Sequence, residues 1–308
     1  MVQIIISGFG RSGTTWLSDI ISKSLGGIVL FEPFHPCVFE KSREFIYSCE
    51  YPEKIIKDQL LGLQQRAPTN PWIFRNHLNS PSGEHAEDFI KYIWESSDII
   101  GFKSIRANHS LKLLRRCFPF SKLIHIYRHP FAILSSIINR SQFWKEFGWE
   151  VHKKLFYERA LAHKSFDELF IRFILEKKSQ FLDEREHILL MWCISLMISL
   201  NDLSRENGML VCYEDLYRDP YKETSEILSF LGNENQRLHP SYFFTPSMTS
   251  LNTIHHLRKY HDGEINVSNF FWQEHINQKD QVYLGQLIRE ILSFDEAGLE
   301  LARGKGYI

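Results

Sequence analysis

The chain has 308 residues, of which 44% are hydrophobic and 24% are charged, and its formal net charge is −1. This composition is ordinary for a globular protein. The chain lacks the strong overall basic excess that is typical of proteins binding nucleic acid or anionic membranes. Five scattered cysteines, an odd number with no C-x-x-C pair, favour reduced thiols over a disulfide scaffold or a zinc site.

No targeting or membrane-spanning segment is predicted. The N-terminus runs directly into an apolar stretch, without the basic region and cleavage site of a signal peptide. The longest nearly apolar run, Ile188–Leu200, is too short to cross a membrane and predicts a buried core helix. The 14 histidines form no recognisable metal-binding pattern. We therefore expect a soluble, cytoplasmic protein with no bound metal and no stable membrane insertion.

The first 31 residues predict a β-α-β unit. A strand over Gln3–Ser7 leads into a glycine-rich loop and a helix over Thr14–Leu25. A Gly-Gly pair ends that helix, and a strand over Ile28–Phe31 follows. Two further short apolar runs, Leu123–Tyr127 and Met209–Tyr213, predict buried strands. Short apolar strands between helical stretches favour a parallel sheet that is covered on both faces.

Two long polar segments interrupt this pattern. Residues 38–97 combine helical stretches with proline-containing loops, and residues 139–205 are almost wholly helical in character. No linker divides the chain. We predict a single domain over residues 1–308, an α/β three-layer sandwich with a central parallel sheet. The two segments are expected to be helical insertions that cap the cleft at the carboxyl ends of the strands.

The stretch GFGRSGTTW, residues 8–16, resembles a nucleotide-binding loop without its lysine. Gly8 and Gly13 have the G-x-x-x-x-G spacing, but Thr14 occupies the lysine position. Glycines let the backbone approach an anion, and the free N–H groups of the following helix favour a negative charge. The stretch also offers hydroxyl and guanidinium donors, from Arg11, Ser12, Thr14 and Thr15. These features predict a phosphate or sulfate site.

The segment RSGTTW resembles the 5′-phosphosulfate loop of the sulfotransferases that use 3′-phosphoadenosine 5′-phosphosulfate (PAPS). That family has a lysine or arginine at the position of Arg11 and needs no magnesium. Its second motif places an arginine after a strand and a serine eight residues later, and the two grip the 3′-phosphate. Arg128 and Ser136 match this motif. The resemblance implies a P-loop NTPase-like fold, PAPS as the donor and adenosine 3′,5′-bisphosphate as the product.

Two aromatic residues extend the resemblance to the adenine. VCYEDLYRDP is similar to a family segment whose tyrosine lies near the adenine, and Tyr213 is its counterpart. Trp16 resembles the tryptophan that stacks on the adenine in the cytosolic branch. The alternatives, a tyrosine at the edge of the core and a tryptophan packed on the sheet, stay open.

The general base differs between branches of the family. The cytosolic branch takes a histidine from a K-T-H segment, but GFKSIRANHS has Ile105 at that position. The carbohydrate and tyrosylprotein branches use a glutamate at the end of the second strand, where this chain has Glu32. Burial there is expected to raise the pKa of Glu32 and improve it as a base. His35 is the alternative base.

Short similarities to carbohydrate 6-O-sulfotransferases bear on the acceptor. KSIR is similar to their K-x-V-R segment, which implies that Lys103 helps to bind the sulfuryl group and that Arg106 binds donor or acceptor. FEPFH is similar to their E-P turn, so Glu32 and His35 are expected to line the site for a sugar or glycan hydroxyl. No C-terminal basic run matches the family well, and two candidates for a 3′-phosphate contact are Arg258 with Lys259 and Arg303 with Lys305.

Two other classes of protein remain. One is a P-loop kinase or NTPase that uses Mg-ATP, because MLVCYED resembles a strand ending in magnesium-binding carboxylates. Thr14 in the lysine position and the Arg128–Ser136 pair argue against it, since ATP has no 3′-phosphate. The other is a nucleotide-binding module without a catalytic base.

Overall fold

The computed structural model describes residues 3–35, 38–39, 52–65, 98–138, 153–161, 163, 166–178, 183–203, 207–234, 238–244 and 272–308. Its centre is a five-stranded sheet in the order β2-β3-β1-β4-β5, and every neighbouring pair is parallel. The strands are β1 (Ile4–Gly8), β2 (Ile28–Phe31), β3 (Ile99–Ser104), β4 (Lys122–Tyr127) and β5 (Gly208–Cys212). The predicted α/β class and parallel sheet are confirmed.

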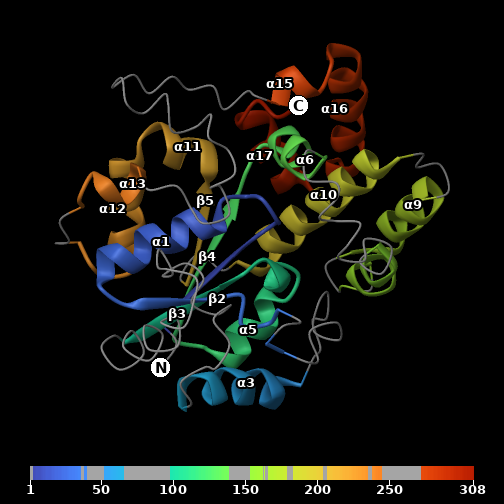
Figure 1. Cartoon of the computed structure of the whole chain (residues 1–308). Helices are drawn as coiled ribbons and strands as arrows, with labels where there is room; N and C mark the ends of the chain where they lie inside the picture. The colour runs from blue at the N-terminus through green and yellow to red at the C-terminus, as the bar shows by residue number, and fades with distance from the viewer. Residues whose placement is uncertain are drawn as a thin grey trace, which may run out of the picture.

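Helices cover both faces of the sheet and make three layers (Figure 1). One face carries α1 (Thr14–Leu25) and α12 (Pro220–Phe230), and the other carries α3 (Glu53–Gln65), α5 (Leu111–Cys117) and α10 (Glu184–Asp202). On the first face, Leu17 of α1 packs with Ile4 and Ile6 of β1. On the second, Ile5 and Phe102 pack with apolar side chains of α3 and α5. Alternating side chains of β1 thus serve both cores, as a strand buried on both faces requires.

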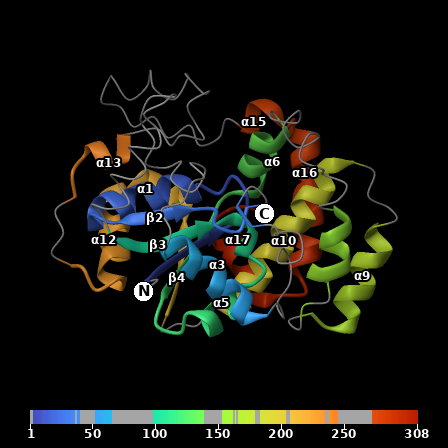
Figure 2. The ribbon, with the colours of Figure 1, turned by 60° about the horizontal axis from the view of Figure 1, so that its bottom comes forward.

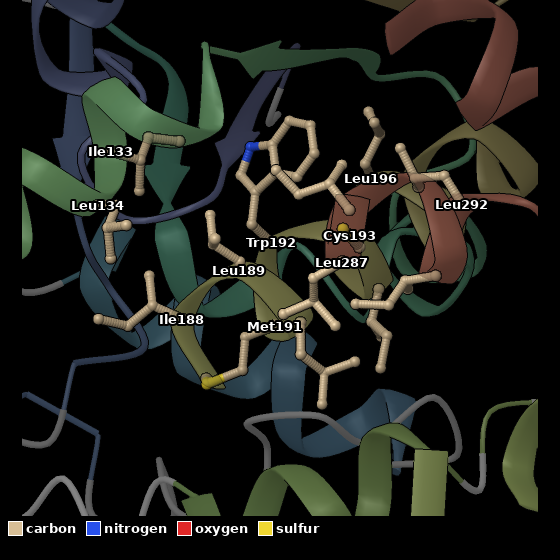
Figure 3. Packing of buried hydrophobic residues seen from close by; sticks show 14 of the residues in the cluster. Ile133, Leu134, Ile188, Leu189, Met191, Trp192, Cys193, Leu196, Leu287 and Leu292 are labelled. Atoms are coloured by element: carbon tan, nitrogen blue, oxygen red, sulfur yellow. The ribbon is translucent and has the colours of Figure 1, made fainter. Parts of the chain in front are cut away.

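The largest core cluster lies around α10. This helix begins at a capping box formed by Asp183 and Glu186, and its side chains from Ile188 to Ile198 are all buried. Figure 3 shows Trp192, Leu189 and Cys193 of α10 among side chains of neighbouring helices. Those neighbours are α6 (Pro130–Ile138), a π-helical turn (Phe156–Ala160), α9 (Glu168–Lys178), α15 (Trp272–His275), α16 (Gln278–Leu292) and α17 (Glu296–Gly304). The predicted buried helix is confirmed.

The remaining elements are η2 (Ile105–Ala107), α11 (Tyr213–Arg218) and α13 (Ser241–Phe244). Across the described ranges, no helix combines the length and apolar character that crossing a membrane requires.

The sheet has a switch point between β1 and β4. The connection after β1 runs through α1 to β2 at one edge, whereas the chain after β4 passes through α6 and α10 to β5 at the other edge. Figure 2, which turns the molecule from the view of Figure 1, shows α1 and α10 separated by the sheet. Diverging connections of this kind leave a crevice at the carboxyl ends of the two strands, where ligands bind in open α/β sheets.

The structure departs from the sequence-based expectation at the bounds of β1, β4 and β5 and in one additional strand, and β4 begins one residue earlier than predicted. β1 begins and ends one residue later than predicted, and β5 ends at Cys212 so that Tyr213 begins α11. β3 was not predicted, because Gly101 and Lys103 interrupt its apolar pattern. Most of the first predicted insertion lies outside the described residues, whereas most of the second is described. Within them, α3 packs on one face of the sheet, and α10 contacts β4 and β5. A cap over the cleft stays a prediction.

Candidate active site

The loop after β1 has the backbone conformation that the predicted anion-binding turn requires. Gly13, which precedes α1, has a φ of 93°, and a Cβ atom there would lie 2.4 Å from Cδ2 of Tyr213. Only glycine satisfies both the left-handed backbone and this close approach. Arg11 also has a positive φ, 71°, a conformation that costs a non-glycine residue energy and is common at functional sites. The loop thus directs the free N–H groups at the start of α1 toward the crevice.

Four of the residues predicted to bind the nucleotide lie close together at this loop. They come from the segments that follow three different strands. Nε of Arg11 donates a hydrogen bond to Oγ of Ser136 on α6, at 2.8 Å. Nη1 of Arg128, which follows β4, donates to the backbone oxygen of Arg11 at 3.2 Å. The Arg128 guanidinium lies 4.2 Å from the centre of the Tyr213 ring, a cation–π contact. The structure therefore joins the loop to the arginine–serine pair, although 117 and 125 residues separate them in sequence.

Two buried polar atoms in this group have no hydrogen-bond partner among the described residues. They are Oγ of Ser12, a residue with 0% exposure, and Nε of Arg128. Leaving such atoms unpaired costs about 1–3 kcal/mol each, and an anionic ligand that accepts from both would remove this cost. The hydrogen-bond donors of this group therefore fit a ligand that is rich in acceptor oxygens, such as a nucleotide with phosphate and sulfate groups.

Trp16 lies beside the tyrosines of α11. Its ring centre is 5.7 Å from that of Tyr213 and 6.4 Å from that of Tyr217, and the indole is partly buried. The two tyrosine rings are stacked at 6.2 Å. The three rings form an aromatic group next to the loop after β1, with faces of the kind on which a flat ring can stack.

A second cluster of charges lies at the ends of β2 and β3. Glu32 is 2% exposed and has a φ of 46°. Oε1 accepts from Nζ of Lys103 at 3.0 Å and from the backbone N–H of Ile105 at 3.0 Å. Oε2 accepts from Oγ of Ser104 at 3.2 Å and lies 3.8 Å from Nη1 of Arg106. Two cations and two uncharged donors thus share one buried carboxylate.

Lys103 connects this cluster to the loop helix. Its side chain is 3% exposed, and Nζ donates to Oγ1 of Thr15 at 3.2 Å as well as to Glu32. Nζ also lies 3.8 Å from the centre of the Phe31 ring. Lys103 therefore bridges the Glu32 carboxylate and the Thr15 hydroxyl at the start of α1.

The expectation of a raised pKa for Glu32 is wrong. Burial alone would raise it, but the charges of Lys103 and Arg106 and the Ile105 hydrogen bond outweigh burial and hold the pKa below its usual range. Burial outweighs the attraction of Glu32 at Lys103, so the pKa of the lysine is also lowered. Arg106 contributes to both shifts, because its charge favours ionised Glu32 and disfavours protonated Lys103, but burial is the main cause at Lys103.

His35 lies three residues beyond Glu32 in a helical turn. Its N–H donates to the backbone oxygen of Glu32 at 2.9 Å, and its own backbone oxygen accepts from Val38 and Phe39. The residue is 6% exposed. The structure thus brings His35 near Glu32 through the backbone.

Two residues of the cluster were not predicted. Ser104 bonds to Glu32 and also caps η2 by accepting from the Arg106 N–H at 3.2 Å. Asp19 lies one turn beyond Thr15 on α1, and burial raises its pKa to about 7 against the opposing charges of Lys23 and Lys103. The i, i+4 spacing of Thr15 and Asp19 is a signal that could have pointed to the same helix face.

The carboxylates after β5 already have protein partners. Glu214 accepts from the His129 N–H and from the Tyr307 hydroxyl, both at 2.9 Å. Asp215 forms an ion pair with Lys305. Lys305, a candidate for the 3′-phosphate contact, is therefore engaged elsewhere, whereas Arg258 and Lys259 lie outside the described residues. A search of the described ranges finds no group of three or more potential metal ligands.

Comparison with known proteins shows what the chain is similar to. The family model described as "Sulfotransferase family" matches residues 3–237. A solved sulfotransferase domain from the Synechococcus PCC 7002 olefin synthase is similar at 17% identity, with 94% of each chain covered and a TM-score of 0.44. A sulfotransferase from Alicyclobacillus acidocaldarius is similar at 14% identity, with 97% of this chain and 96% of that chain covered and a TM-score of 0.45. The search of curated proteins found no match.

Proposed function

Because the chain belongs to the sulfotransferase family, we propose that it moves the sulfuryl group of PAPS to an acceptor hydroxyl. The acceptor oxygen forms the new bond to sulfur, the bond from sulfur to the 5′-phosphate oxygen breaks, and the hydroxyl proton passes to a base. The products are a sulfate ester and adenosine 3′,5′-bisphosphate.

The observation that carries this proposal is the meeting of the loop with the arginine–serine pair. A ligand of ATP type has phosphate only on the 5′ side, so it gives no role to Arg128 and Ser136. In the proposal, the N-terminus of α1 with Ser12, Gly13, Thr14 and Thr15 holds the 5′-phosphosulfate, while Arg128 and Ser136 hold the 3′-phosphate. Arg11, which hydrogen-bonds to Ser136, links the two ends and offsets charge on the leaving phosphate. Trp16 and Tyr213 bind the adenine.

Glu32 is the proposed base. Its lowered pKa keeps it ionised at neutral pH, as a proton acceptor must be. The hydrogen bonds from Lys103, Ser104 and Ile105 orient it. Lys103 offsets negative charge at the sulfuryl group through its position beside Thr15, and His35 is the second candidate for the base.

We propose a sugar or glycan hydroxyl as the acceptor, and Arg106 as a residue that binds it. The support is the similarity of KSIR and FEPFH to segments of carbohydrate sulfotransferases, together with the position of Arg106 beside the Glu32 carboxylate. We also propose that residues 1–308 act as one domain, because one core cluster joins the C-terminal helices to β4, β5, α6 and α10.

The alternative of a magnesium-dependent kinase or NTPase loses its main support. Glu214 and Asp215 would have to bind the metal, but His129, Tyr307 and Lys305 already occupy their oxygens. A metal that displaced these partners would leave the His129 N–H and the Tyr307 hydroxyl without hydrogen-bond acceptors.

The test is ligand-induced stabilisation in the presence of EDTA. Adenosine 3′,5′-bisphosphate at 100 times its Kd should stabilise the protein by about 2.7 kcal/mol, which gives a clear rise in melting temperature. ATP with EDTA should have a much smaller effect at equal concentration. Stabilisation by Mg-ATP alone would refute the donor assignment. Sulfate transfer from labelled donor to a panel of sugars, phenols and alcohols then tests the acceptor class.

A further inference from the structure

The C-terminal turn directs Tyr307 into the core. Gly306, just after α17, has a φ of 67°, although no atom lies within 4 Å of the position that a Cβ would take. This left-handed residue lets the Tyr307 N–H donate to the backbone oxygen of Ala302 at 2.8 Å. Tyr307 is consequently only 4% exposed. Figure 1 marks the C-terminus beside α15 and α16.

One carboxylate connects this turn with two distant loops. Oε2 of Glu214, at the start of α11, accepts from the Tyr307 hydroxyl at 2.9 Å. Oε1 accepts from the backbone N–H of His129, between β4 and α6, at 2.9 Å. The Tyr307 ring lies 4.7 Å from the His129 imidazole, which stacks on Trp272 of α15 at 4.6 Å. Three chain segments are thus joined through a single side chain.

The joined residues are the sequence neighbours of two proposed donor-binding residues. His129 directly follows Arg128, and Glu214 directly follows Tyr213. The Arg128 guanidinium in turn contacts the Tyr213 ring. We propose that Tyr307, Glu214 and His129 form a C-terminal clamp that positions Arg128 and Tyr213 for the 3′-phosphate and the adenine. This inference rests on the proposed donor.

The Tyr307 hydroxyl is the part of the clamp that a substitution can remove cleanly. Without it, the other described donor to Oε2 of Glu214 is the Cys212 thiol at 3.4 Å, and a thiol is a weak donor. The carboxylate would then be free to turn away from the His129 N–H. Arg128 and Tyr213 would lose their fixed separation, and the donor would have to order them on binding.

The experiment compares Tyr307→Phe with Tyr283→Phe. Tyr283 is the control, because its hydroxyl also donates to a buried glutamate, Glu186, which lies on α10. We expect Tyr307→Phe to raise the Kd of adenosine 3′,5′-bisphosphate about tenfold, equivalent to about 1.4 kcal/mol, and Tyr283→Phe to leave it within about twofold. The donor KM should rise with the Kd, while the acceptor KM and kcat at saturating donor stay near wild type.

A second variant, Gly306→Ala, removes no contact and strains only the turn, so it should raise the Kd in the same direction. Equal Kd values for the wild type and for all three variants would overturn the clamp and leave the donor assignment standing. An equal rise in Kd for both tyrosine variants would also overturn it, because the effect would then be general loosening. Failure of the wild-type protein to bind the bisphosphate would refute the donor assignment itself.

Discussion

Replacing Lys103 with methionine should destabilise the protein by about 3–5 kcal/mol, the usual cost of leaving a buried charge without its partner. The Lys103 and Glu32 side chains are each 3% exposed, and Nζ lies 3.0 Å from Oε1. Methionine has a similar length, so the loss is electrostatic rather than a cavity. Arg106 remains 3.8 Å from the carboxylate and is 13% exposed, which places the expected loss toward the lower end of that range.

A double-mutant cycle identifies the source of the loss. Glu32→Gln alone leaves the Lys103 charge buried, whereas Glu32→Gln with Lys103→Met removes both charges. We expect the double variant to be more stable than the sum of the single losses predicts, by about 1–3 kcal/mol. Urea unfolding at pH 7, followed by circular dichroism, gives each value. Additive losses, each below about 1 kcal/mol, would show that the buried pair contributes little.

The pH dependence supplies a second criterion. The pKa of Glu32 is lowered in the folded protein, so the stability it contributes is present above the usual carboxyl pKa and is lost as pH falls through the lowered value. Without Lys103, burial should instead raise this pKa. The deficit of Lys103→Met should therefore be largest near pH 7 and should shrink as the pH approaches about 4. A deficit that is constant over this range would refute the assigned pKa shift.

A substitution of Glu32 should affect turnover but not binding of the donor nucleotide. Glu32→Gln should keep a near wild-type Kd for adenosine 3′,5′-bisphosphate, because the proposed donor contacts do not include it. Turnover should fall by about 10²–10⁴-fold, the usual contribution of a general base. Isothermal titration and single-turnover transfer of labelled sulfate measure the two effects. Wild-type turnover in this variant would remove Glu32 from the mechanism and leave His35 as the candidate base.

Two further predictions concern donor binding and acid stability. Arg128→Ala should weaken binding of the bisphosphate by about 1.5–3 kcal/mol, or about 10- to 150-fold in Kd. The control is Arg116→Ala, at a half-exposed residue of α5, which should leave the Kd unchanged. An unchanged Kd for Arg128→Ala would contradict the 3′-phosphate assignment. Burial lowers the pKa of His125 to about 3, so its stabilisation is present above the unfolded pKa near 6.5 and is lost as pH falls below that value. His125→Gln should therefore flatten the fall in unfolding free energy between pH 8 and pH 5 by about 2 kcal/mol, and identical pH slopes in urea titrations would refute this.

Local sequence was sufficient for the elements that carry strong local signals. The helix Thr14–Leu25 and the strand Ile28–Phe31 were predicted with the bounds the structure has. The buried helix around Ile188–Leu200 was also predicted, because a run of apolar residues is a local feature. β3 was missed because Gly101 and Lys103 interrupt its pattern, and the tertiary contacts with Glu32 and Thr15 make a buried lysine tolerable there.

The sequence by itself determined the kind of protein and the residues to examine. The glycine spacing, Thr14 in the lysine position and the eight-residue separation of Arg128 and Ser136 are all local patterns that a single chain displays. The tertiary structure decided how these residues are charged and held. It lowered the pKa of Glu32 instead of raising it, engaged Lys305 with Asp215 and brought Tyr307 to Glu214 across 93 residues. The physical reason is that burial and the charges of distant neighbours set electrostatics, and both exist only once the sheet has brought the ends of its strands together.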